Sequence, residues 1–310
     1  MHWPKLSSRR IIFAALVVAV ALPVLVVTRE ARRDIVDFVR RAPPMQVQVR
    51  STENARGVET SVMALGDDDG IALGSLRLPP GGGPFPALVI LGGVRTGRRA
   101  LDLVPQDLPL AVATLDYAHD GDLSLDGPGL VTRLPALVRD ARRTAVALRD
   151  LARFVARHPR VDASRVYLLG ASLGTPFACV TAAADARAGL VLLYGFADHA
   201  VVFDHALRPH VRWQPARTFL AHVGGALTRG FDARRTLPRA CGTPVLFVTS
   251  PEDTAVPRRS TEALWNAACE PRQHVELPGG HIDAARKSAI LQESTAIILA
   301  WIAQRRSTRL

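Results

Sequence analysis

The chain has 310 residues, 48% of them hydrophobic, which accommodates one large domain with a tail and does not require a second domain. Its formal net charge of +11 comes almost wholly from arginines scattered along the sequence, and aromatic residues make up only 5% of it. A nucleic-acid-binding protein would cluster its basic residues, with interleaved aromatics, in a recognition module, so the composition excludes nucleic-acid-binding proteins. The three cysteines lack the spacing of zinc ligands, which argues against a zinc site.

An uninterrupted apolar run extends from Ile11 to Val27 and has arginines on both flanks. Its length is at the short end of what spans a bilayer and at the long end of the apolar core of a signal peptide. Ala19-Val20-Ala21 is similar to a cleavage site, but the apolar residues continue for another turn and a half, which a cleaved signal does not need. We expect residues 1–28 to form an apolar helix that anchors the chain in a membrane, with a cleaved signal as the alternative. The flanking arginines leave the orientation open.

Residues 29–44 are predicted to form a charged, partly helical stalk. The next run, Met45–Arg50, alternates apolar and polar residues, which is typical of a half-buried strand. Two further runs, Val58–Leu65 and Ile71–Leu78, flank the glycine- and aspartate-rich stretch Gly66–Gly70. This pattern predicts a β-hairpin.

Six short runs rich in Val, Ile and Leu follow, and their continuous apolarity indicates strands that are buried on both faces, as in a parallel sheet covered by helices. These runs are Ala87–Leu91, Leu110–Leu115, Arg165–Leu169, Leu190–Tyr194, Val245–Thr249 and His274–Leu277. Between them, apolar residues recur at helical spacing, as from Leu137 to Val155. The opposite face of that helix carries charged residues, among them Arg149 and Asp150, which we expect to face solvent.

Strands that alternate with such helices predict a doubly wound, mostly parallel α/β sheet with helices on both faces. We expect this domain to extend over residues 45–304 and a basic tail to follow at 305–310. Residues 196–238 interrupt the alternation, because they contain no clear strand pattern. They are predicted to form a small helical insertion.

The pentapeptide Gly170–Gly174, of the form G-x-S-x-G, lies between a predicted buried strand and a predicted helix. Two glycines permit a turn tight enough to lift the Ser172 hydroxyl clear of the sheet, at the positive end of the helix. In this strand–turn–helix context the motif predicts a nucleophilic serine. The alternative is a glycine-rich turn whose serine only caps the helix.

Two other candidates follow later strands, at the carboxyl edge where an open α/β sheet binds its ligand. Asp253 and Glu252 follow Val245–Thr249, and His281 follows a Gly-Gly turn after the last predicted strand. A neutral imidazole takes the proton of the serine, and a fixed carboxylate holds the tautomer of the imidazole. We therefore predict Ser172, His281 and Asp253 as catalytic residues, with Glu252 as the alternative acid.

The oxyanion of an acyl-transfer transition state needs positioned N–H donors. The N–H of Leu173, directly after the nucleophile, is the first candidate. The second is expected in the turn after Ala87–Leu91, where glycines let the backbone approach a substrate. Val94 is the predicted donor there and Gly93 the alternative.

These motifs, in this order, resemble those of the α/β-hydrolase superfamily, and most closely its dienelactone-hydrolase-like serine esterases. The residues that carry the resemblance are Val161–Val166 leading into Gly170–Gly174, then Asp253–Pro257, then Gly279–His281. The resemblance covers the chain from about Val58 to Trp301. The superfamily often has His-Gly after its third strand, where this chain has Leu91-Gly92-Gly93, and this difference leaves the second oxyanion donor open.

The resemblance implies a serine hydrolase that cleaves a carboxylic ester or thioester of a small-molecule acyl substrate through an acyl-serine, with no cofactor and no metal. It also implies that residues 196–238 form a cap over the pocket. An acyltransferase or a peptidase would use the same residues. A hydrolase-like scaffold that binds without turnover is a further alternative, but such a chain has no need of an intact Ser, His and Asp.

Cys241 and Cys269 each precede a predicted strand, Val245–Thr249 and His274–Leu277 respectively. In this fold the two strands are expected to be parallel neighbours about 5 Å apart, so that a disulfide between their amino ends is plausible. The alternative is that all three cysteines are reduced, and Cys179 fits a small buried apolar residue. A disulfide persists in oxidising compartments, so together with the anchor it favours a periplasmic or cell-surface catalytic domain, or a secreted one if the N-terminal segment is cleaved.

Overall fold

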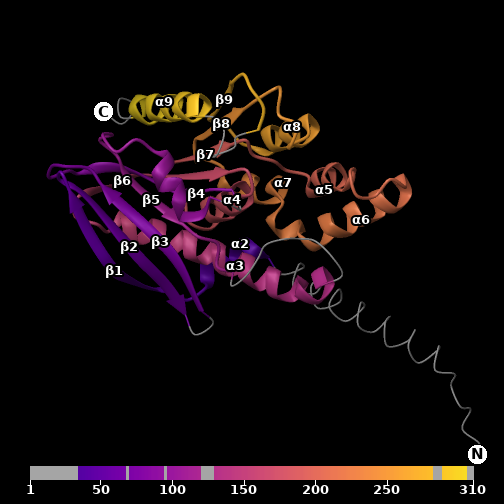
Figure 1. Cartoon of the computed structure of the whole chain (residues 1–310), viewed down its shortest axis with the longest axis horizontal. Helices are drawn as coiled ribbons and strands as arrows, with labels where there is room; N and C mark the ends of the chain where they lie inside the picture. The colour runs from indigo at the N-terminus through magenta and orange to yellow at the C-terminus, as the bar shows by residue number, and fades with distance from the viewer. Residues whose placement is uncertain (1–33, 68–69, 94–95, 120–128, 282–287, 306–310) are drawn as a thin grey trace, which may run out of the picture.

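The computed structural model describes residues 34–67, 70–93, 96–119, 129–281 and 288–305 (Figure 1). In this part of the chain nine strands form one sheet in the order β1-β2-β3-β5-β4-β6-β7-β8-β9. The strands are β1 (Gln46–Ala55), β2 (Val58–Asp67), β3 (Gly70–Leu78), β4 (Phe85–Leu91), β5 (Ala111–Leu115), β6 (Val161–Ala171), β7 (Gly189–Leu193), β8 (Val245–Thr249) and β9 (Arg272–Glu276).

Strands β1, β2 and β3 are antiparallel to one another, and β3 is antiparallel to β5. All pairs from β5 to β9 are parallel. The predicted hairpin and the predicted mostly parallel sheet are therefore confirmed. Every residue of β5, β7 and β8 is buried, which is why these strands consist of continuous apolar runs.

Side chains of the central strands alternate between two cores, one on each face of the sheet. In β4, Ala87, Val89 and Leu91 belong to one core, and Leu88 and Ile90 to the other. The first core is covered by α2 (Ile35–Arg41), α3 (Gly129–Ala156), α4 (Gly174–Ala184) and α8 (Arg258–Ala267). The second is covered by η1 (Gly97–Leu103) and α9 (Ser288–Gln304), and Figure 1 shows α9 across the sheet from α3. The predicted helices on both faces are thus confirmed.

The structure corrects the prediction of a stalk over residues 29–44, because residues 34–44 are part of the domain. Ile35, Val36 and Val39 of α2 are buried in the first core. Asp34 caps this helix by accepting a hydrogen bond from the backbone N–H of Asp37 at 3.0 Å. The many charged residues of the segment hid a narrow apolar stripe at positions i, i+1 and i+4, which is enough to bury one face of a short helix.

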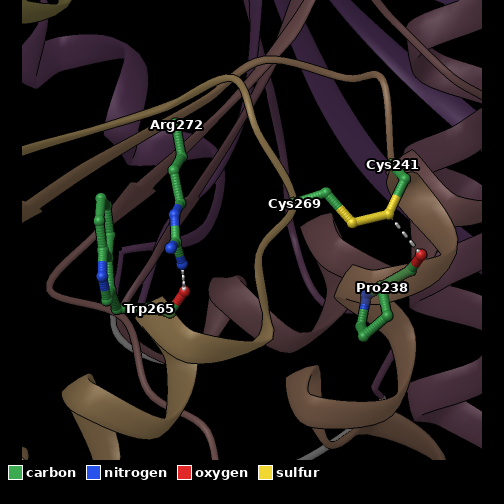
Figure 2. The surroundings of a disulfide bond; sticks show 5 residues. All are labelled: Pro238, Cys241, Trp265, Cys269 and Arg272. Carbon is green, nitrogen blue, oxygen red and sulfur yellow. Dashed lines mark hydrogen bonds between the residues drawn. A yellow bond between two sulfur atoms is a disulfide. The ribbon is translucent and has the colours of Figure 1, made fainter.

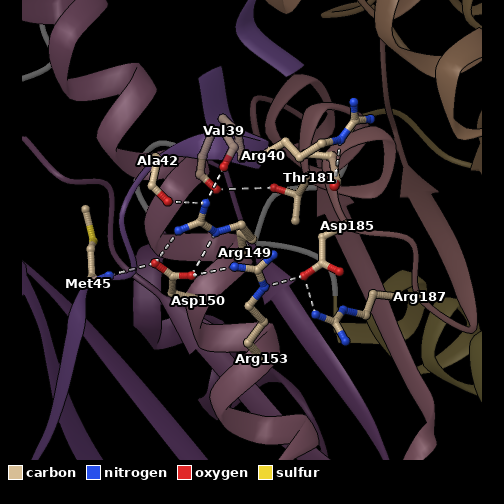
Figure 3. Close-up of polar contacts among 12 residues, drawn as sticks. Val39, Arg40, Ala42, Met45, Arg149, Asp150, Arg153, Thr181, Asp185 and Arg187 are labelled. Atoms are coloured by element: carbon tan, nitrogen blue, oxygen red, sulfur yellow. Dashed lines mark hydrogen bonds and ion pairs between the residues drawn. The ribbon is translucent and has the colours of Figure 1, made fainter. Parts of the chain in front are cut away.

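A wholly buried arginine of α3 holds α2 in place (Figure 3). Arg149 donates hydrogen bonds to the carbonyl oxygens of Val39 and Ala42 at the end of α2. It also donates to both carboxylate oxygens of Asp150 at 2.8 Å, and Asp150 accepts the backbone N–H of Met45 at 2.9 Å. Arg149 and Asp150 therefore do not face solvent as predicted, because the backbone of the preceding segment lies over this side of α3.

The predicted helical insertion is confirmed. It contains α5 (His199–Leu207), α6 (Gln214–Leu227), η2 (Arg229–Phe231) and α7 (Ala233–Thr236), followed by η3 (Leu237–Ala240). Helices α5 and α6 lie at the end of the molecule opposite β1 (Figure 1).

The structure contains a disulfide between Cys241, which follows η3, and Cys269, which follows α8, with their Cα atoms 5.2 Å apart (Figure 2). The bridge joins the end of the insertion to the segment that leads into β9, where Arg272 stacks 4.1 Å above the ring of Trp265. Cys179 is a free, buried cysteine in α4. Burial raises the pKa of its thiol, which keeps it protonated.

Among the described residues no helix is long and apolar enough to cross a membrane. The predicted anchor, residues 1–28, lies outside them, as does the predicted basic tail beyond Arg305.

Candidate active site

The motif Gly170–Gly174 connects β6 directly to α4, the strand–turn–helix arrangement predicted for it. Ser172 has a φ of 50°, a left-handed conformation that an ordinary residue keeps only where its surroundings enforce it. Its N–H donates to the carbonyl oxygen of Leu193 at the end of β7, at 2.9 Å, and its own carbonyl accepts the N–H of Thr175 at 3.0 Å. These two bonds hold the turn in its strained shape.

Both glycines of the motif are required because neighbouring backbone atoms leave no room for a Cβ atom at either position. A Cβ at Gly170 would lie 2.7 Å from the carbonyl oxygen of Gly174 and 2.8 Å from the Cβ of Ala178. A Cβ at Gly174 would collide with the carbonyl oxygen of Leu91 in β4. Because glycine alone fits, α4 begins immediately behind Ser172, and the positive end of the helix dipole faces the reacting centre.

The structure brings the three predicted catalytic side chains into one hydrogen-bonded chain. Nε2 of His281 lies 3.0 Å from Oγ of Ser172, and Nδ1 of the same ring lies 2.7 Å from Oδ2 of Asp253. Ser172 follows β6, Asp253 follows β8 and His281 follows β9. The carboxyl ends of three parallel strands thus supply one residue each, as expected for the ligand-binding edge of an open α/β sheet.

The hydrogen bonds of Asp253 determine which nitrogen of His281 donates and which accepts. Oδ1 of Asp253 accepts the N–H groups of Ala255 and Val256 at 2.8 and 2.9 Å. The side chain of Asp253 is 7% exposed and that of His281 is 22% exposed. Because the carboxylate only accepts, Nδ1–H of His281 donates to it, and Nε2 is left as the acceptor for the Ser172 hydroxyl. The Ser172 hydroxyl is therefore in hydrogen-bond contact with the imidazole of His281 at 3.0 Å.

Glu252, the alternative acid, has a different set of contacts. Its Oε2 accepts the backbone N–H of Gly279 at 3.2 Å. Ser250 contributes to the same junction, since its hydroxyl donates to the carbonyl oxygen of Gly279 and accepts the N–H of Glu252. Glu252 therefore ties the loop after β8 to the turn that precedes His281, and Asp253 is the acid that contacts the imidazole.

Tyr194 supports the imidazole of His281 from the side. The two rings meet edge to face, with centroids 5.7 Å apart at an angle of 79°. Tyr194 is 1% exposed, and its hydroxyl has no hydrogen-bond partner in the part of the chain that the structure describes. Burial, with a further contribution from the charge of Asp253, raises the pKa of Tyr194, so the phenol stays neutral beside the histidine.

The turn after β4 lies beside Ser172. A Cβ built on Gly93 would be 3.9 Å from the Cβ of Ser172. The carbonyl oxygen of Gly93 accepts the N–H of Thr96 at 2.9 Å, and the hydroxyl of Tyr117 donates to the carbonyl oxygen of Gly92 at 2.6 Å. Burial raises the pKa of Tyr117, so it remains a donor at all ordinary pH values. Gly92 and Gly93, here called the glycine loop, are therefore braced by a side chain that follows β5.

The predicted oxyanion donors are only partly covered by the structure. Val94 lies outside the described residues, whereas its alternative, Gly93, is next to Ser172. Leu173 directly follows Ser172, at the start of α4, where helix N–H groups are free of intrahelical partners.

Similar folds have been solved in known enzymes. An acetyl xylan esterase from Paenibacillus sp. R4 superimposes with a TM-score of 0.66 at 18% identity, covering 87% of this chain and 92% of that one. Acetyl xylan esterase 1 from Thermoanaerobacterium sp. JW/SL YS485 gives a TM-score of 0.62 at 19% identity, covering 88% and 93% of the two chains. The protein has the α/β-hydrolase fold. The fold expected from the resemblance of the motifs is thereby confirmed.

Sequence comparison finds a relative over most of the chain but adds no function. The chain is 28% identical over 274 residues to an uncharacterized protein of Mycobacterium tuberculosis (strain CDC 1551 / Oshkosh), covering 85% of this chain and 89% of that protein. No protein-family model matches the sequence. The function proposed below therefore depends on the geometry of the site.

Two residues that contact the candidate site, Tyr117 and Tyr194, were missed from the sequence. Each stands at the carboxyl end of a buried apolar run, and this position was the signal that could have found them. Within the described residues no group of three or more His, Cys, Asp or Glu side chains has the arrangement of a metal site.

Proposed function

We propose that the protein is a serine hydrolase that cleaves a carboxylic ester or thioester through an acyl-serine intermediate. The observation that carries the proposal is the hydrogen-bonded chain from Ser172 through His281 to Asp253. An alcohol with a normal pKa is a poor nucleophile, and the 3.0 Å contact with a neutral imidazole nitrogen provides the base that it needs.

In the first half of the reaction Oγ of Ser172 attacks the carbonyl carbon of the substrate while its proton moves to Nε2 of His281. The resulting oxyanion is stabilised by backbone N–H groups, for which Leu173 and Gly93 or Val94 are the candidates. Collapse of the tetrahedral intermediate breaks the bond to the alcohol or thiol, which leaves with the proton from Nε2. Asp253 stabilises the imidazolium in each transition state and keeps Nδ1 protonated.

In the second half a water molecule attacks the acyl-serine and transfers its proton to Nε2. The second tetrahedral intermediate releases the carboxylic acid, and Ser172 recovers its proton from His281. Atoms balance without any redox step, since one ester and one water give one acid and one alcohol. This chemistry uses Ser172, His281 and Asp253, the backbone N–H donors and a water molecule.

The substrate class follows from the chemistry of the site and from its structural relatives. Two enzymes of similar fold are acetyl xylan esterases, which supports a carboxylic ester as the bond that is cleaved. The three hydrogen-bonded side chains are equally suited to a thioester, because both have an acyl carbon and a leaving group that accepts one proton.

Labelling with a fluorophosphonate probe, followed by assays on p-nitrophenyl acetate and a thioester analogue, tests the proposal. The parent should be labelled and should hydrolyse at least one of these substrates, and Ser172→Ala should abolish both signals while the protein stays folded. Ser164→Ala, on the exposed part of β6, is the matched control and should behave as the parent. Turnover by Ser172→Ala at a near-parental rate would show that another residue is the nucleophile.

The proposal also covers the location of the enzyme: residues 11–27 anchor it in a membrane, and its catalytic domain lies outside the cytoplasm. An apolar run of this length is costly to expose to water, and the Cys241–Cys269 disulfide is of a kind that persists in oxidising compartments. Deleting residues 1–30 should release an active protein from the membrane fraction. Recovery of the full chain without detergent as a soluble monomer with an intact N-terminus would contradict the anchor.

A further inference from the structure

Helix α6 has an outer face with large apolar side chains that the domain does not cover. Trp213, directly before the helix, is 70% exposed, Phe219 is 68% exposed and Leu220 is 46% exposed. Leu220 lies seven residues after Trp213, about two turns further on and near the same side, whereas Phe219 lies about 100° from Leu220 around the helix axis, so the three cover a broad sector of the helix surface. These three residues, here called the α6 outer face, are the most concentrated group of exposed large apolar side chains in the described residues.

Other residues of α6 already make the contacts that fix it to α5. A Cβ on Gly224 would lie 2.8 Å from the ring of Phe203, so the two helices touch closely at this point. Ala221 is buried, and Nε of Arg217 lies 3.0 Å from a carboxylate oxygen of Asp204. The α6 outer face is therefore not needed to hold the insertion together.

The surroundings of this face are positively charged. From residue 205 to residue 231 the sequence contains four arginines and no acidic residue. Arg217 and Arg208 both pair with Asp204, at 3.0 and 3.7 Å, but the side chain of Arg208 is 61% exposed, and Arg212 and Arg229 are exposed as well. Apolar side chains flanked by arginines complement a surface that offers both acyl chains and anionic phosphates.

The size of the face argues against a second protein as its occupant. With the exposures above, Trp213, Phe219 and Leu220 present roughly 400 Å² of accessible surface. A stable protein–protein interface takes about 800 Å² from each partner. A few aromatic and aliphatic side chains are, by contrast, sufficient for a helix to lie in a bilayer interface.

The point where the chain joins the domain also lies near the insertion. Oδ1 of Asp34, the first described residue, is 2.5 Å from a guanidinium nitrogen of Arg239 in η3, the element that follows the insertion. The apolar run ends at Val27, and the six residues between Val27 and Asp34 span at most about 20 Å. A domain anchored through residues 11–27 thus stays within reach of the bilayer surface on the side where the insertion is rooted.

We infer that the α6 outer face docks on an anionic phospholipid bilayer, with Trp213, Phe219 and Leu220 at the level of the headgroups and upper acyl chains and the neighbouring arginines at the phosphates. The contact makes α6 a second point of attachment besides the N-terminal segment. It places the insertion of the candidate hydrolase, and not only its N-terminus, at the membrane. The inference concerns a surface and is independent of whether Ser172 is catalytic.

Fluorescence quenching in the full chain tests the contact. The protein is reconstituted in vesicles of phosphatidylcholine and phosphatidylglycerol, with or without bromine on the acyl chains, in a Trp3→Phe background that removes the tryptophan next to the anchor. Brominated lipid should quench a fraction of the emission, and Trp213→Phe should abolish at least about nine tenths of that fraction. Trp301 is 2% exposed and the ring of Trp265 is stacked against the Arg272 guanidinium, so neither should be quenched. Equal quenching with and without Trp213 would overturn the inference.

Variants distinguish the bilayer from other occupants. Phe219→Ser together with Leu220→Ser should reduce the quenching of Trp213 several-fold, whereas Val49→Ser, at a residue 52% exposed on the remote strand β1, should leave it unchanged. Replacing phosphatidylglycerol by phosphatidylcholine should reduce it as well. If Trp213 is shielded from aqueous acrylamide yet not quenched by brominated lipid, a second copy of the chain or its own apolar segment covers the face, and the inference is wrong.

Discussion

Asp253→Asn is the substitution whose effect the structure defines most closely. Oδ1 of Asp253 accepts two backbone N–H groups, from Ala255 and Val256, and Oδ2 faces Nδ1 of His281. In the variant the amide oxygen has to stay with the two N–H donors, because the opposite orientation would lose both hydrogen bonds and bring N–H against N–H. The amide NH₂ group therefore points at His281.

An NH₂ group donates, so Nδ1 of His281 would become an acceptor and the ring proton would move to Nε2. A protonated Nε2 has no lone pair for the Ser172 hydroxyl, and the general base is lost without any movement of the ring. Loss of the correct tautomer in this arrangement costs about 10⁴ in rate, which corresponds to about 5.5 kcal/mol of transition-state stabilisation. The fold should be unaffected, since the backbone bonds to residue 253 survive.

The assay is kcat/KM on p-nitrophenyl acetate, or on the best substrate found, with thermal unfolding as a check on the fold. Glu252→Gln is the matched control: its amide oxygen can keep the 3.2 Å bond to the N–H of Gly279, so its rate should stay within about threefold of the parent. An Asp253→Asn variant within tenfold of the parent, or a Glu252→Gln variant that falls as far, would refute the reasoning.

Two further substitutions test the supports of the site and the fold. Arg149→Leu should lower the free energy of unfolding by about 3–5 kcal/mol, because it leaves a buried carboxylate without its main partner. The matched change Arg139→Leu, at a side chain 63% exposed on the same helix, should cost no more than about 0.5 kcal/mol. Equal shifts in thermal or urea unfolding would contradict the role of Arg149. Tyr117→Phe removes the 2.6 Å bond to the carbonyl of Gly92 and should lower kcat roughly tenfold with little change in KM, because the glycine loop is less well positioned. Unchanged kcat in steady-state kinetics would show that this brace does not serve the reaction.

The parts of the fold that could be predicted from the sequence are those in which a local sequence pattern is compatible with only one structural environment. A continuous apolar run such as Val245–Thr249 is compatible with few environments other than the middle of a covered sheet, and β8 has the same bounds. Gly170–Gly174 was identifiable for a similar reason, because its glycines are dictated by backbone approach and not by preference. Asp253 was found through its position after such a run, whereas His281 follows β9, an edge strand whose residues are mostly exposed and not buried on both faces as predicted, and was found through the Gly-Gly turn before it.

The errors arose where a residue's environment depends on segments far away in the chain. Arg149 has the sequence context of a solvent-exposed helical residue, and only the backbone of residues 39–43, more than 100 positions earlier, buries it. The burial of α2 was missed for the same reason. Its short apolar stripe is buried only because α3 and α4 pack beside it, and neither helix is near it in the sequence. Nothing in the local sequence distinguishes Tyr117 and Tyr194 from other aromatic residues. Their place near Ser172 follows from the order of the strands in the sheet.

The two left-handed residues of the site, Ser172 and Tyr194, show how the sheet itself assembles the catalytic groups. Both have φ of 50° and both directly follow strands, β6 and β7 respectively, that are neighbours in the sheet. Each such conformation costs about 1–3 kcal/mol, and each is held by a backbone bond to the next strand, from Ser172 N–H to Leu193 and from Tyr194 N–H to Val248. The ends of β6, β7 and β8 are thereby linked in series by main-chain groups, and no side chain of the hydrogen-bonded chain takes part in the linkage. Ser172→Ala should consequently leave the imidazole of His281 and the ring beside it in place, so the activity lost in that variant measures the nucleophile and not a collapsed turn.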